Sequence, residues 1–151
     1  PARACAHFLE REAHLREVIG RVTKAEEWGV RVALRAQPAR RAVPARTTPS
    51  SGAGYLLGKR AQYQSAASRQ GRVRQLASEL FDALATLSSA TKQRQEAQAP
   101  GGLVLDAAFL VPRVEATHLK AAATRYARAL KPEGGDVTLT GPWPPYSFVQ
   151  D

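Results

Sequence analysis

The 151-residue sequence predicts an α+β fold, in which helices cover one face of a sheet. Apolar and polar residues alternate in "EWGVRVALR" (27–35), the run "LVLDAAFLV" (103–111) is almost wholly apolar, and the segments around both have helical spacing. The visible order is α-β-α-β-α-β. One more strand before the first helix would give βαββαβ, the split βαβ or ferredoxin-like pattern, with a long helix inserted in the middle. We therefore expect a ferredoxin-like sheet whose first strand is missing from this chain.

The first two elements are predicted from the spacing of apolar residues, which changes from helical to strand-like between them. Residues 4–24 are predicted to form a helix because their apolar residues recur every three to four positions: Cys5, Phe8, Leu9, Leu15, Val18, Ile19 and Val22. The next segment has period two, which is typical of a half-buried strand. Its apolar positions are Trp28, Val30, Val32 and Leu34.

Residues 36–54 contain three prolines and two glycines, and they predict a flexible loop. A long helix is expected over 55–98, with an interruption near Gly71 as one option. Its apolar stripe consists of Val73, Leu76, Ala77, Leu80, Leu84 and Leu87, and the stripe thins out after Leu87. A helix of this length exceeds what a compact domain needs, so part of it should project or pack against a partner.

The second half of the chain contains three further elements. "PGG" (100–102) ends the long helix, and the apolar run 103–111 predicts a central strand that is covered on both faces. Pro112 ends this strand, and residues 114–131 predict a helix that Pro132 ends. Its inward positions are Val114, Leu119, Ala122, Ala123, Tyr126 and Leu130. "VTLT" (137–140) is expected to form a short last strand.

The composition restricts the compartment and the partners. No apolar run approaches the roughly 18 residues of a membrane span. The single cysteine excludes an internal disulfide framework and fits a reducing, cytoplasmic location. The net charge of +9 is concentrated in residues 35–98, which hold eleven Lys or Arg residues and three acidic ones. Such a segment can contact nucleic acid, anionic lipid or an acidic protein, or it can simply be a solvated exterior.

The sequence offers no group of residues typical of catalysis, so we expect no enzyme, metal site or cofactor. The three histidines, His7, His14 and His118, lack the spacing of metal ligands. The pair Gly58-Lys59 resembles the end of a phosphate-binding loop, but Ala53 stands where the first glycine is required and Arg60 where a hydroxyl residue is required.

The stretch "GPWPPYSF" (141–148) places three prolines beside three aromatic residues. Proline removes a donor from a strand ladder, so this stretch cannot continue a central strand. One interpretation is a stiff tail that folds over the sheet edge, with Trp143 and Phe148 in the core. Another is a half-exposed binding surface, because Trp and Tyr combine apolar area with a polar group. The spacing Pro142-x-x-Pro145 also fits a polyproline II ligand.

Three motifs resemble those of the gas vesicle protein F/L family. "LTGPWPPYSFV" (139–149) is similar to the ending of that family, "EWGVRV" (27–32) to one of its strands, and "GAGYLLGKRAQ" (52–62) to the start of its long helix. The resemblance spans nearly the whole chain but only the family's C-terminal domain, and the N-terminal domain of the family is absent. Gly58 and Gly71 depart from the family, which favours charged helix formers there.

The resemblance implies a non-enzymatic accessory protein of gas vesicle assembly, located on the gas-facing side of the shell. Its expected partners are the hydrophobic shell protein, which it would keep from aggregating, and other accessory proteins. The matched motif residues, which are candidates for partner binding, are Trp28, Gly29, Tyr55, Leu56, Gly141, Pro142, Trp143, Pro144, Pro145, Tyr146 and Phe148.

The hypothesis for the binding surface combines Trp143, Tyr146 and Phe148 with a face of the long helix. The residues of that helix face are Leu80, Leu84 and Leu87. The competing interpretation is a basic module that binds nucleic acid through Arg69, Arg72 and Arg74.

Overall fold

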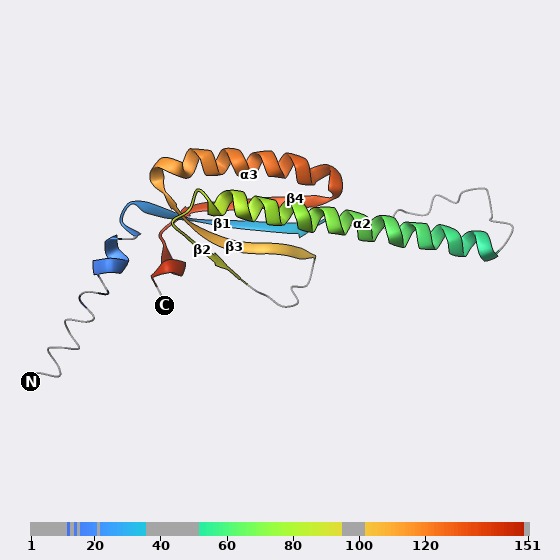
Figure 1. Ribbon diagram of the computed structural model, residues 1–151, viewed down its shortest axis with the longest axis horizontal. Helices are drawn as coiled ribbons and strands as arrows, with labels where there is room; N and C mark the ends of the chain where they lie inside the picture. The colour runs from blue at the N-terminus through green and yellow to red at the C-terminus, as the bar shows by residue number, and fades with distance from the viewer. Residues whose placement is uncertain are drawn as a thin grey trace, which may run out of the picture.

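The computed structural model describes residues 12, 14, 16–20, 22–35, 52–94 and 102–149 (Figure 1). The strands are β1 (Ala25–Leu34), β2 (Ala90–Gln93), β3 (Leu103–Pro112) and β4 (Gly135–Trp143), and the two complete helices are α2 (Gly52–Ala85) and α3 (Ala116–Leu130). Short 3-10 turns follow β3, α3 and β4, namely η1 (Arg113–Glu115), η2 (Lys131–Glu133) and η3 (Tyr146–Phe148). In the first predicted helix, 4–24, residues 12, 14, 16–20 and 22 are helical and residues 23–24 form a turn, while the others lie outside the described residues.

The four strands form one sheet in the order β2-β3-β1-β4, and every neighbouring pair is antiparallel. Strand β3 lies between β1 and β2, which are joined by α2, so this is a split βαβ arrangement. The predicted α+β, ferredoxin-like class is confirmed. Strand β3 is central, as its apolar run predicted, and so is β1.

The assignment of elements within this fold was wrong in two respects. Strand β1 is the first strand of the pattern, so the described residues contain all four of its strands, and α2 is its first crossover helix and not an insertion. The predicted helix 55–98 ends at Ala85, and residues 90–93 form β2. These four residues pair with 107–110 of β3, and the Ser89 N–H donates to the Leu110 carbonyl (2.8 Å). Pairing with β3 therefore outweighs the local helix propensity of Lys92 and Gln93.

Helix α2 also begins earlier than expected. It starts at Gly52, so residues 52–54 of the predicted loop are helical, and residues 36–51 lie outside the described ones. The helix continues through both Gly58 and Gly71. The option of an interruption near Gly71 was therefore wrong.

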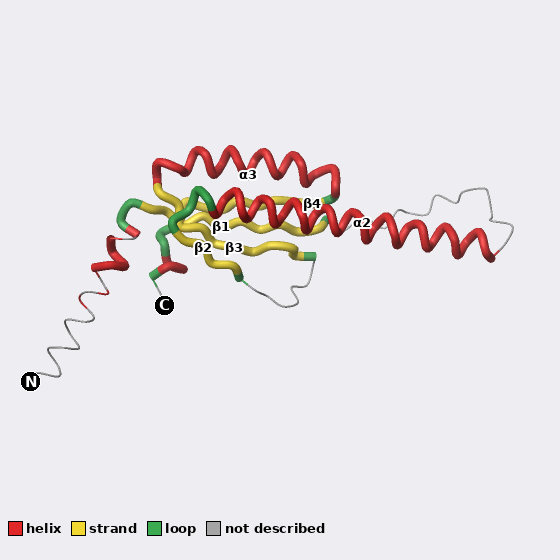
Figure 2. The backbone as a smooth tube through the Cα atoms, viewed as in Figure 1, coloured by secondary structure: helices red, strands yellow, loops and turns green. Residues whose placement is uncertain are grey.

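The core lies between one face of the sheet and helices α2 and α3, which both run along that face (Figures 1 and 2). Alternate residues of the strands form the sheet side of this core, and apolar residues of α2 and α3 form the helix side. The fully buried members with the largest side chains include Phe109, Leu80, Leu84, Leu119 and Leu130. Full burial of such a side chain contributes roughly 1.5–3 kcal/mol. Val114 was predicted to point inward, but it is 81% exposed because residues 113–115 form η1 before α3 begins.

The opposite face of the sheet is partly polar. Arg31 and Asp106 are directly opposed on β1 and β3, and the Arg31 Nε donates to the Asp106 carboxylate at 3.0 Å. Ala108 and Leu110 of β3 are fully buried on this face. Glu27 of β1 is opposite Leu110 and is also buried. This end of the second face holds the C-terminal residues.

Helix α2 is longer than the sheet that it covers. Its 34 residues extend about 51 Å, whereas the 10-residue strands β1 and β3 extend about 33 Å. The N-terminal part of α2 accordingly extends past the sheet in Figure 1, and residues 53–68 are all exposed. We refer to residues 53–68 as the projecting half of α2. Projection of part of the long helix was expected from its length.

Candidate functional site

Two of the sequence motifs meet at the pairing of β1 with β4. Gly29 is opposite Thr140 and Glu27 is opposite Trp143, with a register shift between these pairs. The shift leaves Trp28 between them, and its ring lies in the core. The Lys120 ammonium lies 5.3 Å from the centre of this ring. The motifs "EWG" and "TGPW" are therefore two sides of one contact.

Gly141 is required by this contact. Its φ of +129° is a conformation that residues with a Cβ rarely adopt. A Cβ placed there would also lie 2.9 Å from the Glu27 carbonyl oxygen and 3.1 Å from Cε3 of Trp28. The absence of a side chain at 141 thus lets β4 approach the indole of Trp28.

The tail after β4 is held by the buried carboxylate of Glu27. The backbone N–H of Ser147 donates to Glu27 Oε2 (2.9 Å), and its hydroxyl donates to Oε1 (2.6 Å). Lys92 Nζ donates to the Ser147 carbonyl (3.2 Å), and an Arg94 guanidinium N–H donates to the Ser147 hydroxyl (3.4 Å). Hydrogen bonds that involve a charged group are roughly twice as strong as neutral ones. Ser147 is therefore an anchor that connects η3 to β1 and to the end of β2.

The anchored tail presents apolar side chains to solvent. Trp143 is 56% exposed, Tyr146 is 74% exposed and Val149 is 49% exposed. Pro144 is exposed as well, while Phe148 is half-buried. We refer to residues 143–149 as the C-terminal segment. The interpretation that Trp143 fills the core was wrong, because Trp143 is more than half exposed; the tryptophan in the core is Trp28.

The predicted helix face is not part of an exposed surface. Leu80 and Leu84 are fully buried against the sheet, and Leu87 is packed against the same core. In this fold the three leucines support the sheet, and Leu80 and Leu84 are not accessible to a partner. Tyr55 and Leu56 are exposed, but they belong to the projecting half of α2, whereas η3 of the C-terminal segment lies near the opposite end of that helix (Figure 1).

The residues that sequence reasoning missed are Glu27, Ser147, Lys92 and Arg94. Glu27 lies in the motif "EWGVRV" and Ser147 in the motif "LTGPWPPYSFV", so their position in these motifs could have marked them as candidate site residues. Nothing in the sequence indicated that they contact each other. Lys92 and Arg94 were assigned to a helix, which would have placed them elsewhere.

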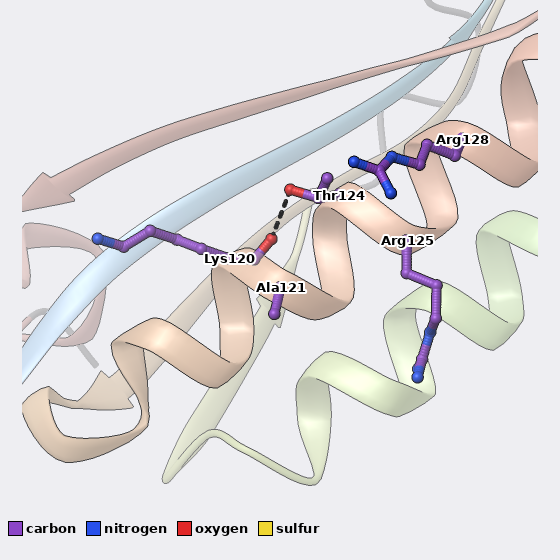
Figure 3. Close-up of a pocket in the computed structure, with 5 residues that line it drawn as sticks. All are labelled: Lys120, Ala121, Thr124, Arg125 and Arg128. Atoms are coloured by element: carbon purple, nitrogen blue, oxygen red, sulfur yellow. Dashed lines mark hydrogen bonds between the residues drawn. The ribbon is translucent and has the colours of Figure 1, made fainter.

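The basic residues are distributed over several surfaces. Arg72 donates to the Glu133 carboxylate at 2.7 Å, and Arg69 donates to the Ser65 carbonyl. A shallow hollow of about 500 Å³ on α3 is lined by Lys120, Ala121, Thr124, Arg125 and Arg128, whose side chains are drawn in Figure 3. Its residues come from one helix, and the Thr124 hydroxyl donates within that helix to the Lys120 carbonyl (2.8 Å).

Within the described ranges, no three His, Cys, Asp or Glu side chains are grouped so that they could hold a metal ion. In the same residues, no helix is both long enough and apolar enough to cross a bilayer.

The comparisons with known proteins agree with the motifs. The model of the family described as gas vesicle synthesis protein GvpL/GvpF matches residues 2–150. The chain belongs to the GvpL/GvpF family. The resemblance that the three motifs indicated is thereby confirmed. No curated protein sequence matches the chain.

Two solved structures of GvpF share the fold. The structure from Anabaena sp. PCC7120 has a TM-score of 0.61 at 16% identity, and the match covers 92% of this chain and 56% of that chain. The structure from Microcystis aeruginosa has a TM-score of 0.57 at 11% identity, covering 97% of this chain and 63% of that chain. The chain therefore spans less than two thirds of either GvpF structure.

Proposed function

We propose that this chain is a gas vesicle accessory protein that supports vesicle assembly by binding the hydrophobic shell protein and preventing its aggregation. The role includes no catalytic step, and its setting is the cytoplasm where vesicles are assembled, with the gas-facing side of the shell as the final location. Membership of the GvpL/GvpF family supports the connection with gas vesicle synthesis.

The observation that carries the proposal is the exposure of Trp143 and Tyr146 beside an anchored serine. Covering a large aromatic side chain with a partner removes a large apolar area from water, which favours binding. Such side chains are over-represented at binding hot spots. A shell protein with a large apolar face needs a partner that covers this face before assembly, because exposed apolar patches drive association.

The anchor gives the C-terminal segment a second useful property. Ser147 is fixed by Glu27, so the backbone between Trp143 and Ser147 is attached at both ends, by β4 and by η3. A segment that is ordered before binding loses less conformational entropy when it binds. The C-terminal segment can therefore bind a partner without a large ordering cost.

The nucleic-acid interpretation has less support. Of its three arginines, Arg72 is engaged with Glu133, and Arg74 borders a small hollow beside Phe81 and Leu105. No stacking aromatic residue accompanies them on the exposed side of α2 between residues 64 and 80.

Co-expression with a gas vesicle shell protein tests the proposal. The shell protein should co-purify with the chain and remain in the supernatant after sedimentation. The double variant Trp143→Ala/Tyr146→Ala should lose most of this effect while it retains the native circular dichroism spectrum. Tyr63→Ala is the matched control, because Tyr63 (69% exposed) and Tyr146 (74% exposed) differ little in accessibility.

Undiminished binding by the folded double variant would exclude the C-terminal segment as the contact surface. A loss of binding in Tyr63→Ala alone would place the contact on α2. Binding to duplex DNA that weakens steeply with salt, together with indifference to shell protein, would favour the nucleic-acid interpretation.

A further inference from the structure

The projecting half of α2 exposes a stripe of large apolar side chains. Tyr55 is 57% exposed, Leu56 is 67% exposed and Tyr63 is 69% exposed. No residue from 53 to 68 is buried, and the first buried residue of the helix is Val73. An isolated helix of this length is marginally stable in water, so burial of the stripe by a partner would stabilise it.

One edge of the stripe, at Tyr55, continues the buried side of the same helix. At 100° per residue, Tyr55 lies in line with Val73, about five turns away. Leu56 and Tyr63 are about two turns apart and lie about 100° and 80° further round the helix than Tyr55, so the stripe is about 100° wide. The Lys59 ammonium lies 5.8 Å from the centre of the Tyr63 ring, on the same side. Leu57 lies about 100° further round the helix than Leu56, away from the stripe.

The charge of this region is of one sign. Between residues 52 and 74 the helix carries Lys59, Arg60, Arg69, Arg72 and Arg74 and no acidic residue. Its first turn also lacks an acidic side chain, so the positive end of the helix dipole adds to these charges. A second copy of this chain would bring like charges together, whereas an acidic partner would be attracted.

We propose that the projecting half of α2 is a docking site for an acidic amphipathic helix of another protein. The partner's apolar side would cover Tyr55, Leu56 and Tyr63, and its acidic side chains would face Lys59 and Arg60. This is helix-on-helix recognition with anchors about two turns apart. The site is separate from the C-terminal segment and does not depend on binding of the shell protein.

An apolar stripe with helical spacing favours a protein helix over nucleic acid. Phosphate contacts would use Lys59 and Arg60 but would leave Leu56 without a role, because a leucine side chain has no π-face on which a base can stack. A partner helix uses the leucine, the two tyrosines and the cations together.

The test uses a synthetic acidic peptide of about three heptads, with Leu at the apolar positions and Glu beside them. A matched peptide carries Lys in place of Glu. Fluorescence anisotropy should show that the full chain binds the acidic peptide and not the basic one. Binding should protect residues 53–68 from hydrogen exchange.

Variants of two neighbouring leucines define the face. Leu56 and Leu57 are both 67% exposed, so they differ in direction and not in accessibility. The double variant Leu56→Ala/Tyr63→Ala should bind the acidic peptide at least about tenfold more weakly, as expected for truncated anchors. Leu57→Ala should change the affinity by less than about twofold, as expected away from the contact.

Four results would overturn the proposal. They are failure of the acidic peptide to bind, equal binding of the basic peptide, equal weakening by Leu57→Ala and Leu56→Ala, and self-association of the chain that Leu56→Ala abolishes. Binding of duplex DNA or of anionic phosphatidylserine vesicles that requires Leu56 would likewise assign the site to another class of partner. All these residues lie outside the core, so each variant should retain the native unfolding curve.

Discussion

The Glu27 carboxylate accepts two hydrogen bonds from Ser147, a residue 120 positions away in the sequence. Glu27 is on the central strand β1 and is 7% exposed, while Ser147 is in the last turn of the chain. The pair connects the "EWG" motif to the "PPYSF" motif. It determines where the exposed side chains of Trp143 and Tyr146 are held.

Removal of either partner should loosen the C-terminal segment. Ser147→Ala should lower the free energy of unfolding by about 1–2 kcal/mol, and Glu27→Ala by about 2–3 kcal/mol, because the latter leaves several donors unsatisfied. Urea unfolding measures both values, and hydrogen exchange at residues 146–149 should accelerate.

Ser65→Ala is the control for the loss of a hydroxyl group. The Ser65 hydroxyl donates to the Gln62 carbonyl on exposed helix surface, so its removal should change stability by less than about 0.5 kcal/mol. Equal effects of Ser65→Ala and Ser147→Ala would contradict the anchoring role.

Gly141→Ala should be strongly destabilising. The substitution combines a φ of +129° with a Cβ that would lie 2.9 Å from backbone oxygen. We expect a loss of about 3 kcal/mol or more in the free energy of unfolding. Gly134→Ala is the matched control, since Gly134 has a φ of +82° but no heavy atom within 4 Å of the added Cβ.

The control should lose only about 1 kcal/mol, the usual cost of a left-handed residue with a Cβ. Chemical denaturation of the two variants side by side measures the difference. If the two losses were the same, the contact between Gly141 and Trp28 would have no energetic weight.

Gly71→Ala should stabilise the protein. Gly71 is in the interior of α2, and an added Cβ there would meet nothing within 4 Å. Alanine at such a position gains about 0.5–1 kcal/mol over glycine. The melting temperature should rise, and a lower value would indicate that the helix is interrupted at this residue after all.

Leu80→Ala should separate the two roles that were considered for α2. Leu80 is fully buried, so its truncation should destabilise the protein by about 2–5 kcal/mol. Leu56→Ala on the projecting half should change stability by less than about 0.5 kcal/mol. Thermal or urea unfolding checks both, and a small effect at Leu80 would mean that it does not belong to the core.

Several elements could be predicted from local pattern. The alternation from Trp28 to Leu34 and the apolar run 103–111 identified both central strands, because a residue's face on a strand follows directly from its position. The apolar spacing of Leu119, Ala123 and Leu130 identified α3 in the same way. The motif "GPWPPYSF" marked the C-terminal segment, since its prolines exclude a central strand.

Strand β2 could not be predicted in this way. Its sequence "ATKQ" has no apolar alternation and lies within the segment 55–98 that was predicted to be helical. It becomes a strand because the edge of β3 offers backbone partners, which are 14–20 residues away along the chain and known only in the fold.

By itself, the sequence determined which side of each helix and strand is apolar, because helical and strand periods are local properties. Only the tertiary structure decided what covers each side. The apolar side of α2 meets the sheet at Leu80 and solvent at Tyr55, although both positions belong to one helix. Glu27 meets Ser147 because the register of β4 and the turn at Pro144 bring the chain back, and contacts of such long range depend on the whole fold.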